Sequence, residues 1–159
     1  MTTYSFHPLQ RTDLTRLRQW QAQPHVSAWW GSDPDDDDAV RRDPRVDRFI
    51  VQADGTPFAF MQDYSVHGWP DHHFAALPPG SRGIDQYIGD PAMIGQGHGP
   101  AFIATRVAAL FAAGAPVIAT DPHPDNTRAI AAYKKVGFTA FAPPRETPWG
   151  LILPMKRLR

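Results

Sequence analysis

The chain has 159 residues, a length typical of one compact domain, and its 16 Lys and Arg are balanced by 16 Asp and Glu. This balance, without a basic face, excludes a nucleic-acid partner, and the lack of cysteine excludes disulfides, thiolate metal sites and a nucleophilic thiol. Because no apolar run approaches ~18 residues and residues 1–10 lack a signal-peptide pattern, we expect a cytoplasmic protein with no membrane partner.

The first quarter of the chain predicts a strand and two helices. Residues 4–8 predict a short strand, and apolar residues then recur at helical spacing over 14–20, with Thr12 or Asp13 as the helix cap. The acidic residues within 33–38 predict a second helix start at Ala39, because carboxylates stabilise the positive end of a helix dipole.

The middle of the chain is rich in strand signals. Residues 49–53 and 58–64 are β-rich runs joined by Asp54-Gly55, which predicts a hairpin. A loop rich in Pro, Gly and His over 67–80 then leads to a predicted strand at 83–88.

The second half alternates helices and strands and ends in two strands. A helix over 102–111 ends near Gly114, and a second helix over 126–136 ends at Gly137. The predicted strands of this half are 117–120, 138–141 and 151–155. The chain is therefore predicted to be a mixed α/β domain.

Residues 94–99 read Ile-Gly-Gln-Gly-His-Gly and lie between a predicted strand and a predicted helix. Alternate glycines let the backbone approach a bulky anion, and free N–H groups at a helix start bind phosphate oxygens. An ordinary flexible loop is the competing interpretation. A P-loop is excluded because no Gly-Lys-Ser/Thr follows, and a Rossmann site because no βαβ unit with an acidic ribose ligand surrounds the motif.

Two motifs further along the chain narrow this choice. Residues 125–130 read Asp-Asn-Thr-Arg-Ala-Ile, and residues 133–138 read Tyr-Lys-Lys-Val-Gly-Phe. Together with the glycine segment they resemble the acetyl-CoA signature of the GNAT acetyltransferase superfamily. Residues 27–31, 82–86 and 120–122 resemble matching segments of the aminoglycoside 6′-N-acetyltransferases in that superfamily.

The resemblance covers most of the chain, and it implies one domain over residues 1–159. Its fold would be a mixed central sheet of about six or seven strands flanked by about four helices. Acetyl-CoA would be the cosubstrate, with no metal. The resemblance implies that the cofactor is held by Ile88, Ile94, Gly95, Gln96, Gly97, His98, Gly99 and Asn126.

Two residues are expected to carry the catalysis. An alkyl ammonium with a pKa near ~10 must lose a proton before it attacks a thioester, which requires a nearby carboxylate. The resemblance assigns this role to Asp85, directly or through a water, and Asp is otherwise disfavoured in a strand. It assigns protonation of the leaving thiolate to Tyr133, and stabilisation of the oxyanion to backbone N–H groups near Tyr87 and Ile88.

Five residues are expected to contact the acceptor amine. Trp29 and Trp30 offer a flat wall for a sugar ring, although core packing is the competing interpretation for paired tryptophans. Gln62 and Tyr64 supply polar contacts, and the resemblance assigns to Asp121 a part in holding a cationic substrate.

Three histidines, His67, His72 and His73, invite a metal hypothesis. Their spacing matches no standard site and no carboxylate or thiol pattern completes it, so we assign no metal. The surrounding loop, 67–80, contains Asp71 as its one acidic residue, a composition that suits a smaller or less charged amine than a polycationic drug.

The leading hypothesis is therefore acetyl transfer from acetyl-CoA to a small-molecule primary amine, the 6′-amine of an aminoglycoside. One alternative is an N-acetyltransferase of the same fold for another small amine or a peptide N-terminus. An alternative of a different class is a non-catalytic module that binds CoA. The chain is expected to be a monomer or a homodimer.

Overall fold

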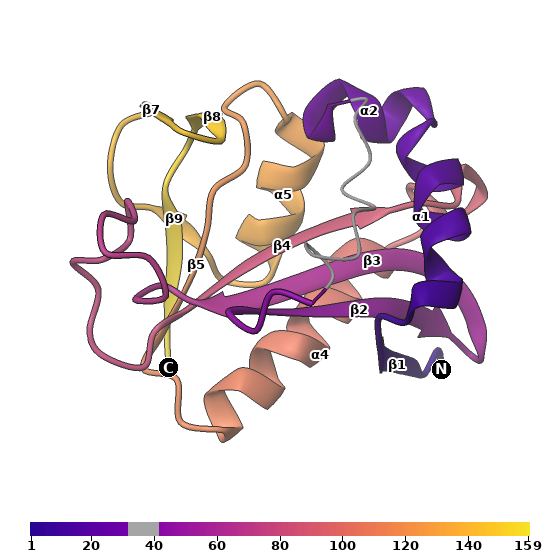
Figure 1. The fold of residues 1–159 in the computed structure, drawn as a ribbon, viewed down its shortest axis with the longest axis horizontal. Helices are drawn as coiled ribbons and strands as arrows, with labels where there is room; N and C mark the ends of the chain where they lie inside the picture. Colours follow the sequence, from indigo (N-terminus) through magenta and orange to yellow (C-terminus); the bar gives the residue numbers. More distant parts are fainter. Residues whose placement is uncertain (32–41) are drawn as a thin grey trace. The chain divides into compact units, whose positions relative to one another are not determined.

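The computed structural model describes residues 1–31 and 42–159. The predicted helix start at Ala39 and the acidic stretch 33–38 lie outside the described residues. Within the described ranges the chain forms nine strands and four α-helices in a mixed α/β arrangement (Figure 1). The predicted fold class is therefore confirmed.

Seven strands form one mixed sheet in the order β1-β2-β3-β4-β5-β9-β6, and β7 pairs with β8 in a separate hairpin. The strands are β1 (Tyr4–Pro8), β2 (Val46–Ala53), β3 (Thr56–Ser65), β4 (Arg82–Ile88), β5 (Val117–Thr120), β6 (Thr139–Ala140), β7 (Arg145–Thr147), β8 (Gly150–Ile152) and β9 (Met155–Leu158). β4 and β5 run parallel, whereas β9 is antiparallel to both of its neighbours, β5 and β6.

The chain divides into two compact units, each assembled from segments that are distant in sequence. Unit 1 comprises Met1–Asp63 and Gln86–His98, and unit 2 comprises Tyr64–Asp85 and Gly99–Arg159. Strands β3 and β4 contribute residues to both units.

Unit 1 begins with the elements that the sequence predicts. β1 pairs antiparallel with β2, and β2 turns into β3 through Asp54 and Gly55, whose φ values of 49° and 85° suit a tight hairpin turn. Helix α1 (Leu14–Gln21) follows a 3₁₀ turn, η1 (Arg11–Asp13). Asp13, one of the two predicted caps, occupies the N-cap position of α1, but its carboxylate accepts the Gln10 backbone N–H at 2.9 Å and makes no capping hydrogen bond to α1.

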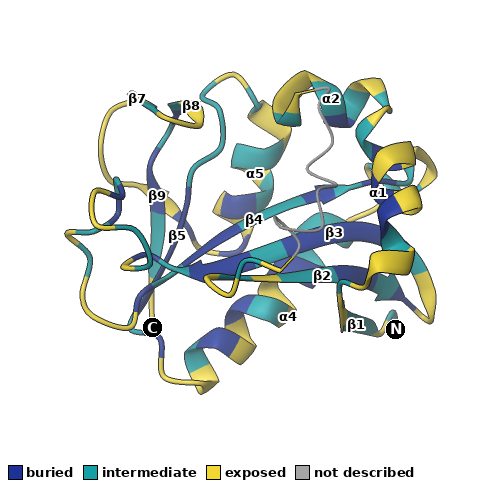
Figure 2. Cartoon of the chain, in the orientation of Figure 1, coloured by how far each residue is buried: buried dark blue, intermediate teal, exposed yellow. Residues whose placement is uncertain are grey.

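The core of unit 1 is largely aromatic and aliphatic. Helix α2 (Pro24–Trp30) follows α1 directly, with proline in its first turn, where the missing N–H costs no helical hydrogen bond. The cluster of buried residues consists of Leu14, Leu17, Trp20, Val26, Ile50, Phe60 and Tyr87, against which Leu9 and Trp30 pack. Figure 2 shows the outer faces of α1 and α2 largely exposed, as expected of amphipathic helices.

Unit 2 is built on the fully buried strand β5. Helix α5 (Thr127–Lys135) begins at Asn126, whose side chain accepts the Ala129 N–H, and its chain turns out of the helix at Gly137, with φ 96°. Helix α4 (His98–Ala112) starts earlier than the sequence predicts, within the glycine segment. Its large buried residues are Phe102, Ile103, Val107 and Leu110.

The predicted strand 151–155 is wrong. The segment breaks into β8, which ends at Ile152, and β9, which begins at Met155. Pro154 has no N–H to donate to a ladder, and the Leu153 N–H is used by the Pro122 carbonyl at 2.8 Å. The break lets β9 join β5 inside the sheet while β8 turns back onto β7.

Candidate functional site

In unit 1 the glycine loop, residues 94–97, leads into the first turn of α4. Gly95 and Gly97 have φ values of 75° and 84°, a left-handed conformation that favours glycine. Both are exposed, and a Cβ added to either would meet no atom within 4 Å. The loop therefore exposes its backbone at the start of a 15-residue helix, where N–H groups attract anions.

Side chains next to the glycine loop are engaged in holding its shape. The Gln96 amide donates to the Ala92 carbonyl at 2.6 Å, and the Asp90 carboxylate accepts the Ala92 N–H at 2.9 Å. His98 hydrogen-bonds the Tyr4 hydroxyl through Nδ1 at 2.7 Å. The side chains of Gln96 and His98 therefore make hydrogen bonds within the protein.

The remaining unit 1 candidates differ in exposure. Trp30 packs edge-on against Phe60 and Tyr87, with ring centroids 5.8 and 5.0 Å apart, whereas Trp29 is 43% exposed. Trp30 is thus a packing residue, whereas Trp29 is partly exposed. Gln62 is half-buried on β3.

The predicted oxyanion segment of β4 is anchored at its carbonyl side. His25 donates from Nε2 to the Ile88 carbonyl at 2.8 Å, which ties α2 to the end of β4. Gly89, the next residue, donates its N–H to the Phe58 carbonyl at 2.8 Å. The backbone here is held in a fixed orientation.

In unit 2 the parallel register of β4 and β5 brings two carboxyl groups together. Gly83 pairs with Ala119, and the Thr120 hydroxyl donates to the Ile84 carbonyl at 2.9 Å. The same register carried onward sets Asp85 opposite Asp121, and their side chains share a hydrogen bond. Burial raises the pKa of Asp121, and the hydrogen bond from Asp85 opposes that rise.

Two tyrosines complete this acidic cluster. Tyr64 is 5% exposed, and its burial raises its pKa well above the usual value, with further contributions from Asp121, Asp85 and Tyr133. The Tyr64 ring lies against Gly83 so closely that any side chain at that position would overlap it. Tyr133 is 3% exposed and packs against Phe138. The structure thus brings Asp85, Asp121 and Tyr133 near Tyr64.

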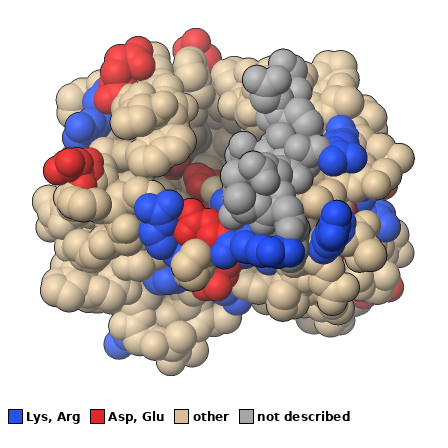
Figure 3. All heavy atoms as spheres, in the orientation of Figure 1, with Lys and Arg blue, Asp and Glu red and all other residues tan. Residues whose placement is uncertain are grey.

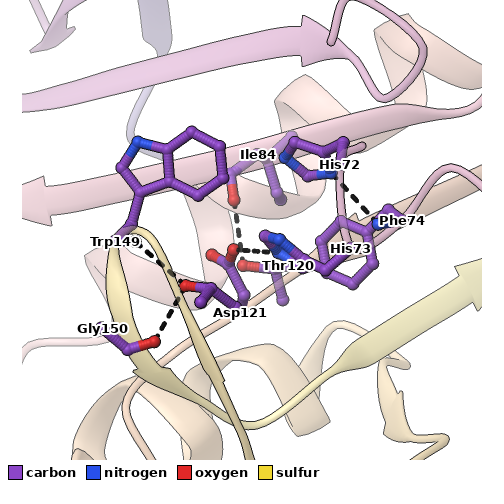
Figure 4. A network of polar contacts seen from close by, with 9 residues as sticks. His72, His73, Phe74, Ile84, Thr120, Asp121, Trp149 and Gly150 are labelled. Carbon is purple, nitrogen blue, oxygen red and sulfur yellow. Dashed lines mark hydrogen bonds and ion pairs between the residues drawn. The ribbon is translucent and has the colours of Figure 1, made fainter. Parts of the chain in front are cut away.

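His73 is a member of the cluster that the sequence did not identify. Figure 4 shows its ring directed at Asp121, and His73 Nε2 lies 2.8 Å from Asp121 Oδ2. The His73 side chain is 3% exposed, and the Asp121 side chain is 16% exposed. Burial lowers the pKa of His73, the Arg145 cation lowers it further, and Asp85 acts in the opposite direction.

His72 stacks on His73 with ring centroids 4.1 Å apart. Its Nδ1 accepts the Phe74 backbone N–H at 3.1 Å, which fixes the ring in this position. Burial, followed by the neighbouring His73, lowers the pKa of His72 to about 4, so the ring is neutral at physiological pH.

An exposed tryptophan adjoins the histidines. Trp149 is 61% exposed, and its ring centroid lies 5.4 Å from that of His72 and 6.4 Å from that of Trp69. Its position in the β7–β8 turn is fixed by Thr147, whose hydroxyl donates to the Gly150 carbonyl and accepts the Trp149 N–H. The sequence analysis singled out neither Trp69 nor Trp149; a tryptophan in a Thr-Pro-Trp-Gly turn was the available signal.

The part of the chain that the structure describes contains no group of three or more His, Asp or Glu arranged to hold a metal ion. Nor does any helix within residues 1–31 and 42–159 combine the length and apolar character needed to cross a membrane. On the face shown in Figure 3, basic and acidic side chains are interspersed.

Comparisons with known proteins agree with this geometry. The model of the acetyltransferase (GNAT) domain matches residues 10–143. An aminoglycoside N(6′)-acetyltransferase type 1 from Klebsiella pneumoniae is 33% identical over 141 residues, spanning 79% of this chain and 69% of that protein.

Two solved structures have the same fold along nearly the whole chain. The structure of AAC(6′)-Ib with ribostamycin and coenzyme A matches with a TM-score of 0.88 at 30% identity, covering 99% of this chain and 94% of that one. The structure of AAC(6′)-Ib with paromomycin and acetyl-CoA matches with a TM-score of 0.86 at 28% identity, with the same two coverages.

Proposed function

Since the chain belongs to the GNAT acetyltransferase family, we propose that it transfers an acetyl group from acetyl-CoA to the 6′-amine of an aminoglycoside. The observation that carries the proposal is the cluster of two half-buried carboxyl groups, Asp85 and Asp121, with two buried tyrosines, Tyr64 and Tyr133. Such a cluster provides a base, an anionic contact for an ammonium group and a proton donor in one place.

The residues around the glycine loop fit coenzyme A. Two exposed glycines in left-handed conformations leave open space beside the backbone, and the first turn of α4 follows immediately. We assign the diphosphate to the backbone N–H groups of residues 95–99, because the Ile94 N–H donates to the Pro91 carbonyl at 3.3 Å. Ile94, Ile88 and Asn126 are the further proposed cofactor contacts. Bound acetyl-CoA supplies an activated thioester carbonyl.

Asp85 is the proposed general base. A primary ammonium with a pKa near ~10 is protonated at neutral pH, and a carboxylate in reach of the amine accepts its proton, directly or through a water. Asp85 lies opposite Asp121, with which it shares a hydrogen bond, and burial raises the pKa of Asp121.

Tyr133 is the proposed general acid for the departing thiol. Its side chain is 3% exposed, and it interacts electrostatically with Tyr64 of the same cluster. The backbone N–H of Ile88 is the proposed donor to the developing oxyanion, in a segment already fixed by the His25 hydrogen bond. No covalent enzyme intermediate is required.

Asp121 is the proposed contact for a cationic acceptor, with Tyr64 and Gln62 as hydrogen-bonding groups. The exposed indole of Trp149 adjoins the histidines beside Asp121, and it offers a flat face for a sugar ring alongside the proposed role of Trp29. Trp30 contributes by packing against Phe60 and Tyr87.

A second acceptor class is favoured by one observation. The loop 67–80, which carries His72 and His73, contains Asp71 as its one acidic residue, so a polycationic drug finds few carboxylates there. A smaller amine with one ammonium group needs only the carboxyl groups of Asp85 and Asp121. This alternative keeps the same chemistry and changes the acceptor.

The proposal is tested with a panel of amines, acetyl-CoA and detection of the released thiol. Kanamycin-type drugs, spermidine, an amino sugar and a short peptide are assayed under the same conditions. Turnover of the drugs above the other amines supports the proposal, and drugs left untouched while another amine reacts would replace it by the second class. Use of acetyl-CoA, a cytoplasmic metabolite, accords with the predicted cytoplasmic location.

A further inference from the structure

The hydrogen bond between His73 and Asp121 defines which nitrogen of the imidazole carries the proton. The Asp121 carboxylate accepts, so the hydrogen in the 2.8 Å contact belongs to His73 Nε2. His73 Nδ1 is buried and has no hydrogen-bond partner among the described residues. A neutral ring with hydrogen on Nε2 leaves only a lone pair on Nδ1, the less costly group to bury unpaired.

The surroundings of His73 hold it in this neutral form. A second proton would sit on Nδ1, where no acceptor lies among the described residues. The charged and titratable groups that face the ring are Asp121 after β5, Asp85 on β4, Arg145 on β7 and His72 in the preceding loop. The two carboxyl groups favour an imidazolium, whereas Arg145, His72 and burial in an aromatic setting disfavour it.

We propose that His73 is a positioning residue, which holds the Asp121 carboxylate for the acceptor amine. This inference rests on the proposed function. As a neutral donor it fixes the Asp121 carboxylate and leaves the negative charge of the acidic pair available to a cationic amine. A Lys or Arg in the same place would also hold Asp121, but it would cancel that charge and repel an ammonium group. The neutrality of the ring, together with its hydrogen bond, is therefore the property on which acceptor binding depends.

Two substitutions of His73 distinguish the effect of its N–H donor from the effect of the rest of its side chain. His73→Gln retains a neutral N–H that can reach Asp121, so the KM for the acceptor should stay within about threefold of the wild-type value. His73→Leu removes the donor and should raise that KM by about tenfold or more, with the KM for acetyl-CoA unchanged. His67→Gln, an exposed change in the same loop, serves as the control.

The dependence of the acceptor KM on pH distinguishes the proposed role of His73 from a purely structural one, because a purely structural role would not change it. As the pH falls through the pKa of His73, the imidazolium cancels the charge of Asp121, so the acceptor KM of the wild-type enzyme should rise. The rise should be absent or much reduced in His73→Gln and retained in His67→Gln. Equal profiles in wild type and His73→Gln would overturn the proposal.

Nitrogen-15 NMR of the histidine rings in the free wild-type protein tests the state of His73 independently of turnover. The expected result at pH 7 is a neutral His73 ring with hydrogen on Nε2, and Asp121→Asn identifies its signals by shifting them. A protonated ring, or hydrogen on Nδ1, would overturn the inference even if the enzyme is active. An enzyme that acetylates no amine would instead refute the proposed function, and the NMR result would still report on His73.

Discussion

The glycine loop of unit 1 and the acidic cluster of unit 2 provide two different kinds of binding surface. The loop offers exposed backbone N–H groups from consecutive residues, and its conformation depends on glycine at positions 95 and 97. The cluster consists of side chains, with Asp85 on β4 and Asp121 directly after β5, two positions that are far apart in sequence. A backbone site tolerates changes of side chain but not of backbone conformation, and the opposite holds for a site made of side chains.

The largest effect that this comparison predicts is on the chemical step. Asp85→Asn should lower kcat by about 100-fold, because an amide cannot accept the proton of the amine. Acetyl-CoA affinity, measured by calorimetry, should be unchanged, because the glycine loop is intact. Asp71→Asn, an exposed change in unit 2, is the control. A parallel loss of acetyl-CoA affinity in Asp85→Asn would contradict the separate roles of the two surfaces.

Two glycine-to-alanine substitutions, one in each unit, should create the same kind of steric overlap with a neighbouring aromatic ring. A side chain at Gly83 would overlap the Tyr64 ring in unit 2, and one at Gly89 would overlap the Trp20 ring in unit 1. Each change to alanine should lower the free energy of unfolding in urea by about 2 kcal/mol. Only Gly83→Ala should also raise the KM for the acceptor, because only it displaces Tyr64 from the acidic cluster. Equal acceptor KM values in the two variants would break the comparison.

The glycine loop can be tested against a glycine at the other end of the same helix. Gly97→Ala forces alanine into a left-handed conformation and should weaken acetyl-CoA binding by about tenfold. Gly114→Ala, at φ 108° and likewise with open space around it, imposes a similar backbone strain just beyond the end of α4. The acetyl-CoA affinity of Gly114→Ala, measured by calorimetry, should match that of the wild type. A tenfold loss of affinity in Gly114→Ala would contradict a specific role of the glycine loop in binding acetyl-CoA.

The smallest effect concerns stability and pH in unit 2. The pKa of His72 is about 4 in the folded chain, below the value of an exposed histidine, so the unfolded chain takes up the proton first. Proton uptake by His72 in the unfolded chain should therefore lower the free energy of unfolding as the pH drops from about 6.5 to about 4. The expected decrease is on the order of 1 kcal/mol, after allowance for hydration of the ring.

His72→Asn tests this contribution, because asparagine retains an acceptor for the Phe74 N–H. Its urea unfolding curves should show a shallower dependence on pH than those of the wild type in the same range. His67→Gln, whose parent side chain is exposed, should keep the wild-type slope. A slope unchanged in His72→Asn would show that His72 is not held neutral.

Local signals in the sequence predicted the elements whose geometry is decided locally. Asp54-Gly55 specifies a tight turn wherever strands flank it, and the apolar run at β5 fits only a buried strand. The strand 151–155 was misjudged because Pro154 interrupts its ladder, and the partner of each fragment is set by the tertiary fold. Asp13 stands at the N-cap of α1 but makes no capping hydrogen bond to it, because a 3₁₀ turn precedes the helix and takes up its carboxylate.

In the candidate site too, residues in contiguous motifs could be predicted from the sequence, whereas a residue positioned by the tertiary fold could not. The glycine loop and Asn126 lie in contiguous motifs and could be recognised from the sequence. His73 could not, because its partner Asp121 is 48 residues away and only the parallel register of β4 and β5 sets the position of that carboxylate. In the sequence, the adjacent histidines suggested only a metal ligand set, an interpretation that their spacing excluded.

The position of β9 has a consequence for synthesis of the chain. Residues 155–158 are translated after β5 and β6, yet in the finished sheet β9 lies between those two strands and hydrogen-bonds both. While a nascent chain is shorter than this, one long side of β5 has unpaired backbone groups, and such an edge recruits foreign strands. Ribosomes that stall or terminate early within this stretch would release a polypeptide prone to aggregate, for which chaperones and proteases must compete.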